Sequence, residues 1–150
     1  MDKGSKEYKL KLAKEIEIRK AIAVKKKDLK YRADFKKFSE DRLKIITKDA
    51  VQGYIPFKFN RAQQKIHKAI EKQLKEKGRV RVIILKARQQ GISTYTAGRV
   101  FWKTLYTPYT RSVVLAHDSA TSDALFTMSK QFIERMPGDT APELVKSNAK

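Results

Sequence analysis

The chain contains no cysteine in its 150 residues and no apolar stretch long enough to cross a bilayer. Without cysteine there is no disulfide and no thiolate metal site, which fits a reducing compartment. The longest apolar runs, VIIL at 82–85 and SVVLA at 112–116, fall far below the roughly 20 residues that a membrane span requires. No apolar segment follows the N-terminal lysines, so we expect no signal peptide.

Acidic residues are also scarce. The chain has 16 acidic residues against 35 lysines and arginines, a net charge of +19 with a pI near 10.1. The excess is spread along the chain, because residues 1–50 carry a net +8 and residues 51–150 a net +11. A field of that sign favours a polyanionic partner, nucleic acid first and anionic membrane second. A lysine-rich surface that only keeps the chain soluble is the alternative.

Helical signals are clear at four places. Residues 6–30 lack glycine and proline and are rich in good helix formers, which predicts a helix. NRAQ, beginning at Asn60, is typical of a capping box, and Gly78 is a good terminator for the helix that follows. Two further helices are predicted over 91–105 and from Asp118 or Ser119 to about 135.

Strand signals alternate with these helices. RVRVIIL (79–85) is β-rich and ends in an unbroken apolar run, as expected for a strand covered on both faces, and SVVLAH (112–117) is a second segment of the buried-strand type. Weaker candidates lie at 43–47 and 143–145, and the segment 53–60 is predicted to be an irregular connection because it contains Gly53 and Pro56. The order strand, helix, strand, helix predicts an α/β fold with a parallel sheet, of which this chain holds about half.

The stretch RVIILKARQQGISTYTAG (81–98) has the layout of a phosphate-binding loop between a strand and a helix. Two positions of the pattern G-x-x-x-x-G-K-S/T fail, because Lys86 replaces the first glycine and Ile92 replaces the lysine. Gly91 allows close backbone approach to a phosphate, and Ser93 stands where a hydroxyl would reach Mg²⁺. An ordinary polar turn capped by Ser93 or Thr94 is the alternative.

Four ordered segments resemble the N-terminal ATPase domain of the large terminase subunit of tailed bacteriophages over about residues 35–137. The segments are FSEDRLKIITKD (38–49), YIPFKFNRAQQKIHKAI (54–70), RVIILKARQQGISTYTAGRVFW (81–102) and SVVLAHDSATSDALF (112–126). The resemblance implies a P-loop NTPase-type parallel sheet with flanking helices. Residues 51–150 would be the front part of that ATPase domain, and residues 1–50 a basic, mostly helical segment before it.

The function implied by the resemblance is a DNA-packaging motor. Such a motor couples ATP hydrolysis to translocation of double-stranded DNA through the portal protein into a procapsid. Its expected partners are double-stranded DNA, the portal protein and the small terminase subunit, and for such a motor no membrane partner is expected. The expected assembly is a homo-oligomeric ring in the host cytoplasm, transiently at the portal vertex of the procapsid.

The resemblance also implies roles for individual residues. Lys86 is similar to the displaced phosphate lysine of variant Walker A loops, and Arg88 to the arginine that senses or stabilises the γ-phosphate, so both are the catalytic candidates. Ser93 would hold Mg²⁺ through its hydroxyl, and Gln63 would contact adenine, with Gln64 as the fallback and a helix-capping role as the alternative. The remaining expected ATP-binding residues are Ala87, Gln89, Gln90, Gly91, Ile92 and Thr94.

Other features of the family pattern are missing. No apolar strand ends in Asp-Glu, and no acidic cluster for a two-metal nuclease is evident; both are expected after residue 150. We therefore expect an N-terminal piece that binds ATP and Mg²⁺ but hydrolyses ATP poorly or not at all. Two alternatives remain: a helicase-like ATPase, disfavoured by the missing lysine before Ser93, and a basic non-enzymatic module that binds nucleic acid.

Two smaller groups are expected to be structural. His117 and Asp118 follow the second predicted strand, where ordinary loop or capping roles are favoured. Trp102, with Phe101 and Tyr106, is expected to pack in the core, not to form a base-stacking platform.

Overall fold

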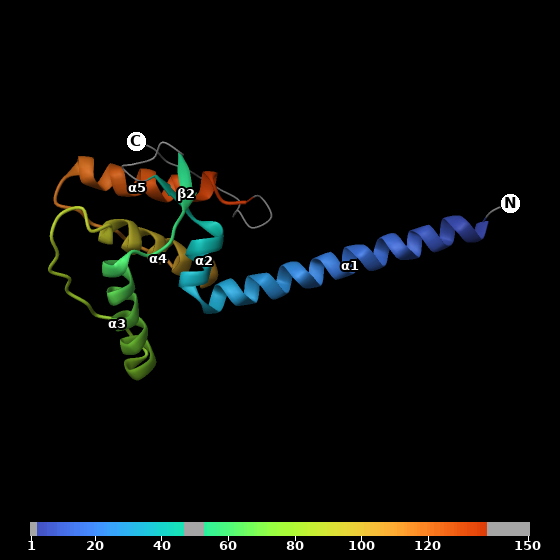
Figure 1. The fold of residues 1–150 in the computed structure, drawn as a ribbon, viewed down its shortest axis with the longest axis horizontal. Helices are drawn as coiled ribbons and strands as arrows, with labels where there is room; N and C mark the ends of the chain where they lie inside the picture. Colours follow the sequence, from blue (N-terminus) through green and yellow to red (C-terminus); the bar gives the residue numbers. More distant parts are fainter. Residues whose placement is uncertain (1–2, 47–52, 138–150) are drawn as a thin grey trace. The chain divides into compact units, whose positions relative to one another are not determined.

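A computed structural model describes residues 3–46 and 53–137, and its path is drawn in Figure 1. In chain order the elements of these ranges are α1 (Lys3–Ala33), α2 (Phe35–Arg42), β1 (Lys44–Ile46), β2 (Tyr54–Pro56), α3 (Arg61–Lys77), α4 (Ile92–Tyr106) and α5 (Ser119–Glu134). The protein divides into two compact units, residues 1–35 and residues 36–150. In the described part of the chain no helix has the length and apolar character needed to span a bilayer.

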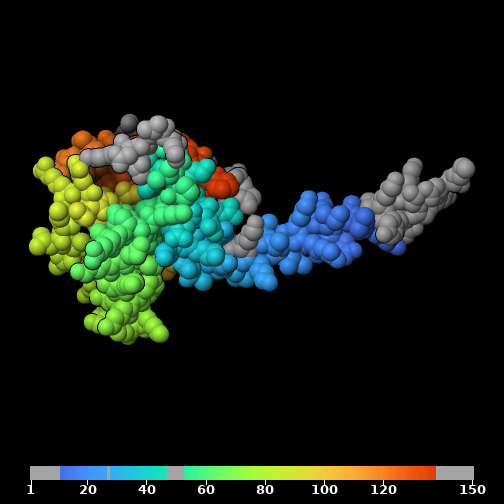
Figure 2. All heavy atoms as spheres, viewed as in Figure 1, coloured from blue at the N-terminus to red at the C-terminus, as the bar shows by residue number. Residues whose placement is uncertain are grey.

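Helix α1 makes up nearly all of the first unit. It confirms the helix predicted over 6–30 and extends it at both ends. Every described side chain between residues 11 and 30 is exposed, and Figure 2 shows this stretch in blue. Apolar and charged residues are mixed on all sides of α1, so it has no distinct apolar face. High intrinsic helix propensity, with i,i+4 pairs such as Glu15–Arg19 at 2.7 Å, accounts for a helix of this kind.

The three helices of the second unit that the sequence predicted are confirmed, together with their ends. Asn60 caps α3 in a complete capping box, and Gly78 ends it in the left-handed conformation at φ 65°. Asp118 caps α5 by accepting the backbone N–H of Thr121 at 2.7 Å. Helix α4 begins directly after Gly91. These boundaries follow from side chains close in sequence, which is why they were predictable.

The sheet consists of a short antiparallel hairpin. Strand β1 pairs with β2 so that Ile45 lies opposite Ile55. The weak strand candidate at 43–47 is confirmed for its described residues, whereas the irregular connection predicted over 53–60 is wrong at 54–56, which form β2. Pro56 is the last residue of β2, where its missing N–H costs no ladder bond in the strand's interior.

Aromatic side chains build the core of the second unit. Phe38 of α2 is fully buried and contacts Tyr106 of α4 edge-on, with ring centroids 5.4 Å apart. Phe101 of α4 in turn packs against Phe132 of α5 at 5.8 Å, and Figure 1 shows α4 and α5 side by side. Phe101 and Tyr106 thus pack against core residues as expected, although both are only half-buried. The elements are held together by helix-on-helix packing and not by a sheet.

The predicted α/β fold with a P-loop NTPase-type parallel sheet is wrong. In the described residues the only sheet is the antiparallel pair β1–β2, and the segments 79–85 and 112–117 form no strand. Their apolar side chains are largely open to solvent: Ile83 and Leu85 are fully exposed, and Leu115 nearly so. A strand requires a neighbouring edge to receive its backbone bonds, and the described chain supplies none to either segment. The weak candidate at 143–145 lies outside the described residues.

Candidate functional site

The predicted phosphate loop is a tight turn between an extended segment and α4. A turn begins at Arg88, and both Gln89 (φ 62°) and Gly91 (φ 68°) adopt the left-handed conformation. Glycine takes that conformation freely, whereas glutamine does so at a cost. The backbone therefore reverses sharply within residues 88–91. The helix starts at the next residue, Ile92.

Helix α3 holds this turn through the two side chains of its capping box. Gln63 Nε2 donates to the carbonyl oxygen of Gly91 at 2.7 Å, and Asn60 Nδ2 donates to that of Gln90 at 3.2 Å. Within the box, Gln63 Oε1 accepts the N–H of Asn60, and Asn60 Oδ1 accepts that of Gln63, both at 2.9 Å. We call Asn60, Gln63, Gln90 and Gly91 the cap–loop junction. It fixes the turn from 28 to 30 residues away in sequence.

The N-terminus of α4 is the feature of this site best suited to an anion. Its N-cap is Gly91, and no side chain caps it. The first backbone bond of the helix, from the N–H of Tyr95 to the carbonyl of Gly91, is 3.1 Å long. The preceding N–H groups of Ile92, Ser93 and Thr94 are thus the helix's unsatisfied donors, at the positive end of its dipole. The alternative in which Ser93 or Thr94 caps the helix is wrong, because both lie inside it.

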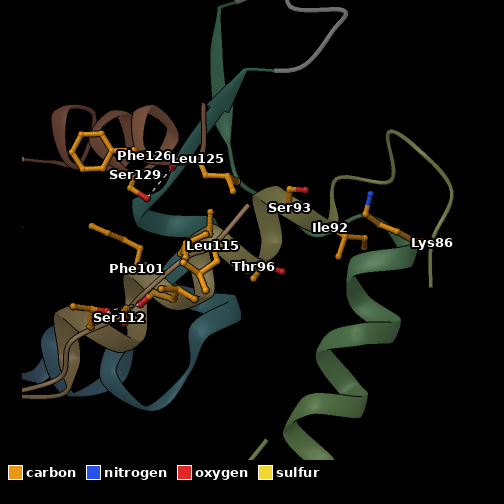
Figure 3. A pocket seen from close by; sticks show the side chains of 14 residues that line it. Lys86, Ile92, Ser93, Thr96, Phe101, Ser112, Leu115, Leu125, Phe126 and Ser129 are labelled. Atoms are coloured by element: carbon orange, nitrogen blue, oxygen red, sulfur yellow. Dashed lines mark hydrogen bonds between the residues drawn. The ribbon is translucent and has the colours of Figure 1, made fainter. Parts of the chain in front are cut away.

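The predicted cations and the hydroxyl are accessible. Lys86, Arg88 and Ser93 are all exposed, and within the described residues no ion pair engages Lys86 or Arg88. Lys86 and Ser93 line one cavity of about 570 Å³, where Figure 3 shows them with Ile92. The rest of this cavity is formed by α4, α5 and the segment 112–115. The loop residues with the most direct chemistry toward phosphate are therefore open to a ligand.

A second cavity adjoins the loop at the cap–loop junction. It measures about 660 Å³, and its apolar part comes from the hairpin residues Ile45, Ile55 and Pro56. Its polar lining comes from Asn60, Gln63, Gln89 and Thr94, with Lys58. A mostly apolar hollow with a few convergent polar groups is typical of small-molecule sites.

The structure gives Gln63 a clear local role. Its side chain is buried, and both of its polar atoms are bonded within the protein, one to the helix cap and one to the loop. The capping alternative is therefore confirmed, while contact with adenine stays a prediction. Gln64, the fallback, donates from Nε2 to the carbonyl of Phe59 at 2.9 Å.

A polar group between α3 and α4 was not predicted. Tyr95 is almost fully buried, and its hydroxyl lies 3.1 Å from His67 Nδ1 and 3.4 Å from Arg99 Nη1. Arg99 also forms an ion pair with Glu71 at 2.7 Å. Burial raises the pKa of Tyr95, and the nearby Arg99 charge partly opposes that rise. The i,i+4 spacing of His67 and Glu71, and of Tyr95 and Arg99, was the available signal, but it did not show which residues would meet.

Asp118 has the capping role expected of it. Asp118 accepts from both the backbone N–H and the hydroxyl of Thr121, at 2.7 and 2.8 Å, which lowers the pKa of its carboxyl. His117 Nε2 lies 2.6 Å from Asp118 Oδ2. Among the described residues, no group of three or more His, Asp or Glu side chains could hold a metal ion. The Mg²⁺ contact of the Ser93 hydroxyl stays a prediction.

Comparisons with protein-family models, with curated proteins and with solved structures found no match for this chain.

Proposed function

We propose that the loop from Lys86 to Thr94 binds the phosphates of ATP in the nucleotide-binding part of a DNA-packaging motor of the large-terminase type. The observation that carries this proposal is the uncapped N-terminus of α4, entered through left-handed Gly91. Its free N–H groups and helix dipole form the arrangement that anions favour. Support comes from the loop and its surroundings alone, since the described residues form no parallel sheet.

The side chains near the loop suit the three parts of the ligand. Lys86 and Arg88 are exposed cations for the β- and γ-phosphates, and the Ser93 hydroxyl would help to hold Mg²⁺. The second cavity, with its apolar hairpin floor and the polar groups of the cap–loop junction, is the place for adenine. Bound Mg²⁺ neutralises phosphate charge, and the chain's own residues position the triphosphate.

The wider setting belongs to the same proposal. The motor would act on double-stranded DNA with the portal protein and the small terminase subunit, as a homo-oligomeric ring at the procapsid portal vertex in the host cytoplasm. The net charge of +19 suits a partner held by phosphate contacts without sequence readout. Hydrolysis would be coupled to DNA movement, although this chain alone is expected to be inactive as an ATPase.

Binding of a fluorescent ATP analogue tests the loop directly. We expect Mg²⁺-dependent binding that is lost in Lys86→Ala and weakened at least tenfold in Ser93→Ala. Lys103→Ala is the matched control, because Lys103 is an exposed lysine in the last turn of α4, away from the loop. Binding that is absent, or equally strong in Lys86→Ala and Lys103→Ala, would rule the proposal out.

A second candidate is a basic nucleic-acid-binding module without nucleotide chemistry. The specific observation in its favour is that the segments 79–85 and 112–117 form no sheet, so Lys86 is not held at the end of a strand. Salt-sensitive DNA binding is expected of both candidates. Duplex binding without any binding of the ATP analogue would therefore select this second candidate.

A further inference from the structure

The strongest feature outside the loop is the charge on α1. Its sequence holds twelve lysines and arginines against four acids, a net charge of +8. All described side chains between residues 11 and 30 are exposed. A helix of 31 residues at about 1.5 Å per residue is roughly 46 Å long. An anionic partner that engages the whole of this surface must extend over a similar length.

One stripe of α1 consists of cations and apolar residues, with acids only at its borders. Residues spaced three and four apart share a face of a helix. The members of this stripe are Lys11, Lys14, Ile18, Ile22, Lys25, Leu29 and Arg32. Two acids border the stripe: Asp28, three residues after Lys25 and four before Arg32, and Glu15, which is paired with Arg19 at 2.7 Å. We call these seven residues the basic stripe.

Cations are not confined to the basic stripe. Lys20, Lys26 and Lys30 lie on other sides of the same helix, so positive charge surrounds most of it. A helix seated in the major groove of duplex DNA has a phosphate backbone on each side of it. Cations on several sides therefore match that environment better than a flat anionic surface does.

We propose that α1 is a duplex-DNA-binding arm, held by salt-sensitive contacts between its lysines and arginines and the phosphates of both strands. This inference rests on the duplex-DNA partner of the proposed function and adds where the contact is made. Duplex DNA carries about one negative charge per 1.7 Å of its axis, the densest polyanion available to such a helix. The contact reads phosphate spacing and groove shape, not base sequence.

Other occupants fit α1 less well. A helix that lies on a membrane needs an apolar face separate from its charged face, and α1 has none. In a parallel, in-register pair with a second copy along the basic stripe, the two Lys25 side chains would face each other between the apolar Ile22 and Leu29. Single-stranded nucleic acid is held largely by aromatic stacking, and the only aromatic residues of α1 are Tyr8 and Tyr31; of these, Tyr31 is buried.

Charge-neutralising variants of the full chain test the arm. Lys14→Gln, Lys25→Gln and Arg32→Gln together remove three charges from the basic stripe while keeping good helix formers. The matched control removes three exposed charges from α3: Lys68→Gln, Lys75→Gln and Lys77→Gln. We expect the α1 variant to raise the dissociation constant for a duplex of random sequence at least tenfold at about 100 mM salt. It should make the slope of log K against log salt shallower by about 2.7, roughly 0.9 for each lost phosphate contact.

A variant that makes α1 more positive tests whether charge, and not a general effect of mutation, controls duplex binding. Glu17→Gln adds one net charge to α1 without removing a cation, so we expect it to tighten duplex binding about two- to fivefold and to steepen the salt slope. Far-ultraviolet circular dichroism checks that helix content is unchanged in every variant. The Mg²⁺-dependent binding of the ATP analogue should also be unchanged, because the loop lies in the other unit.

Three outcomes would overturn the arm. An equal loss in the α1 and α3 variants would leave duplex DNA as the partner but place the contact elsewhere. Binding of the wild-type chain to vesicles rich in phosphatidylserine, or its self-association, with either effect lost in the α1 variant while duplex binding is unchanged, would assign α1 to a different occupant. No duplex binding by the wild type would remove both the arm and the DNA partner. The ATP site is tested separately, by binding of the ATP analogue.

Discussion

The cap–loop junction and the two apolar segments, 79–85 and 112–117, belong to the same unit. They differ in how many of their polar groups are hydrogen-bonded and how much of their apolar surface is buried. At the junction, Gln63 is buried with both polar atoms bonded, and Gly91 occupies a conformation that suits it. In the segments, Ile83 and Leu85 are fully exposed and no backbone ladder forms. A turn can be completed by a few side chains of a nearby helix, whereas a strand needs a second strand along its whole length.

The apolar segments are not wholly free, and their attachments sharpen the contrast. Gln73 of α3 accepts the N–H of Arg81 at 2.6 Å and donates to its carbonyl at 3.2 Å, as a strand neighbour would. Thr104 of α4 bonds the hydroxyl of Ser112. Each attachment lies near the start of its segment, before the apolar run. Single side chains thus substitute for a sheet edge at one residue but not along several.

Tyr95→Ala is expected to have the largest effect, because Tyr95 lies one turn after Gly91 and its ring contacts Phe59 and His67. Its side chain is only 1% exposed, and removing it leaves a cavity and unpaired polar groups. We expect a loss of about 3–5 kcal/mol in the free energy of unfolding. Urea unfolding followed by the fluorescence of Trp102, the single tryptophan, measures it. A loss below about 1 kcal/mol would mean that α3 and α4 do not depend on this contact.

Gly91→Ala should have the next largest effect. A Cβ at this position would lie 2.7 Å from Gln63 Nε2, and φ is +68°. Left-handed strain and the displaced Gln63 bond together should cost about 2–4 kcal/mol in the free energy of unfolding. Gly78→Ala is the control, because φ is +65° but no atom lies within 4 Å of the added Cβ. It should lose only the strain, about 1–2 kcal/mol, and equal losses would argue against the Gln63 contact.

Alkaline pH should lower the free energy of unfolding to a smaller extent. Burial raises the pKa of Tyr95, so the folded protein holds the phenol proton more tightly than the unfolded chain does. The resulting stability is fully present below the unfolded pKa of about 10 and is lost as pH rises through the higher folded pKa. Urea midpoints of the wild type and Tyr95→Phe, measured from about pH 8 to about pH 11, isolate this group. Parallel curves for the two proteins would contradict the expectation.

Leu85→Ser should have the smallest effect on stability. Because this side chain is fully exposed, we expect the free energy of unfolding to change by less than about 0.5 kcal/mol. The same change should lower aggregation, since an exposed apolar segment without a partner strand favours association. Unfolding in urea and light scattering against concentration measure the two effects. A decrease of more than about 1 kcal/mol in the free energy of unfolding would show that this segment is buried in solution, and the segment would then not differ from the junction in burial.

The helices and their ends were predictable because their causes are local. Asn60 and Gln63 form their box across three residues, Gly78 ends α3 with its own backbone conformation, and Asp118 caps α5 through Thr121. The position of the turn around Gly91 was also predictable, since a glycine before a helix is a local signal. For the candidate site, this placed Arg88 in the turn and Ser93 in the first turn of α4, whereas the strand expected to end at Lys86 does not form. Their binding roles stay predictions.

The parallel sheet could not be predicted safely because its cause is not local. Apolar β-branched runs such as 82–85 favour a strand, but only a neighbouring edge makes one, and the described chain pairs β1 with β2 instead. The second use of Gln63 was equally hidden: its sequence position indicates a helix cap, whereas its bond to Gly91 depends on α3 meeting the loop. Local hydrogen bonds and propensities determine the helices of this protein. Contacts between residues far apart in sequence decide whether the apolar segments become strands and hold the loop in place. Such contacts form only when the rest of the fold brings both partners together.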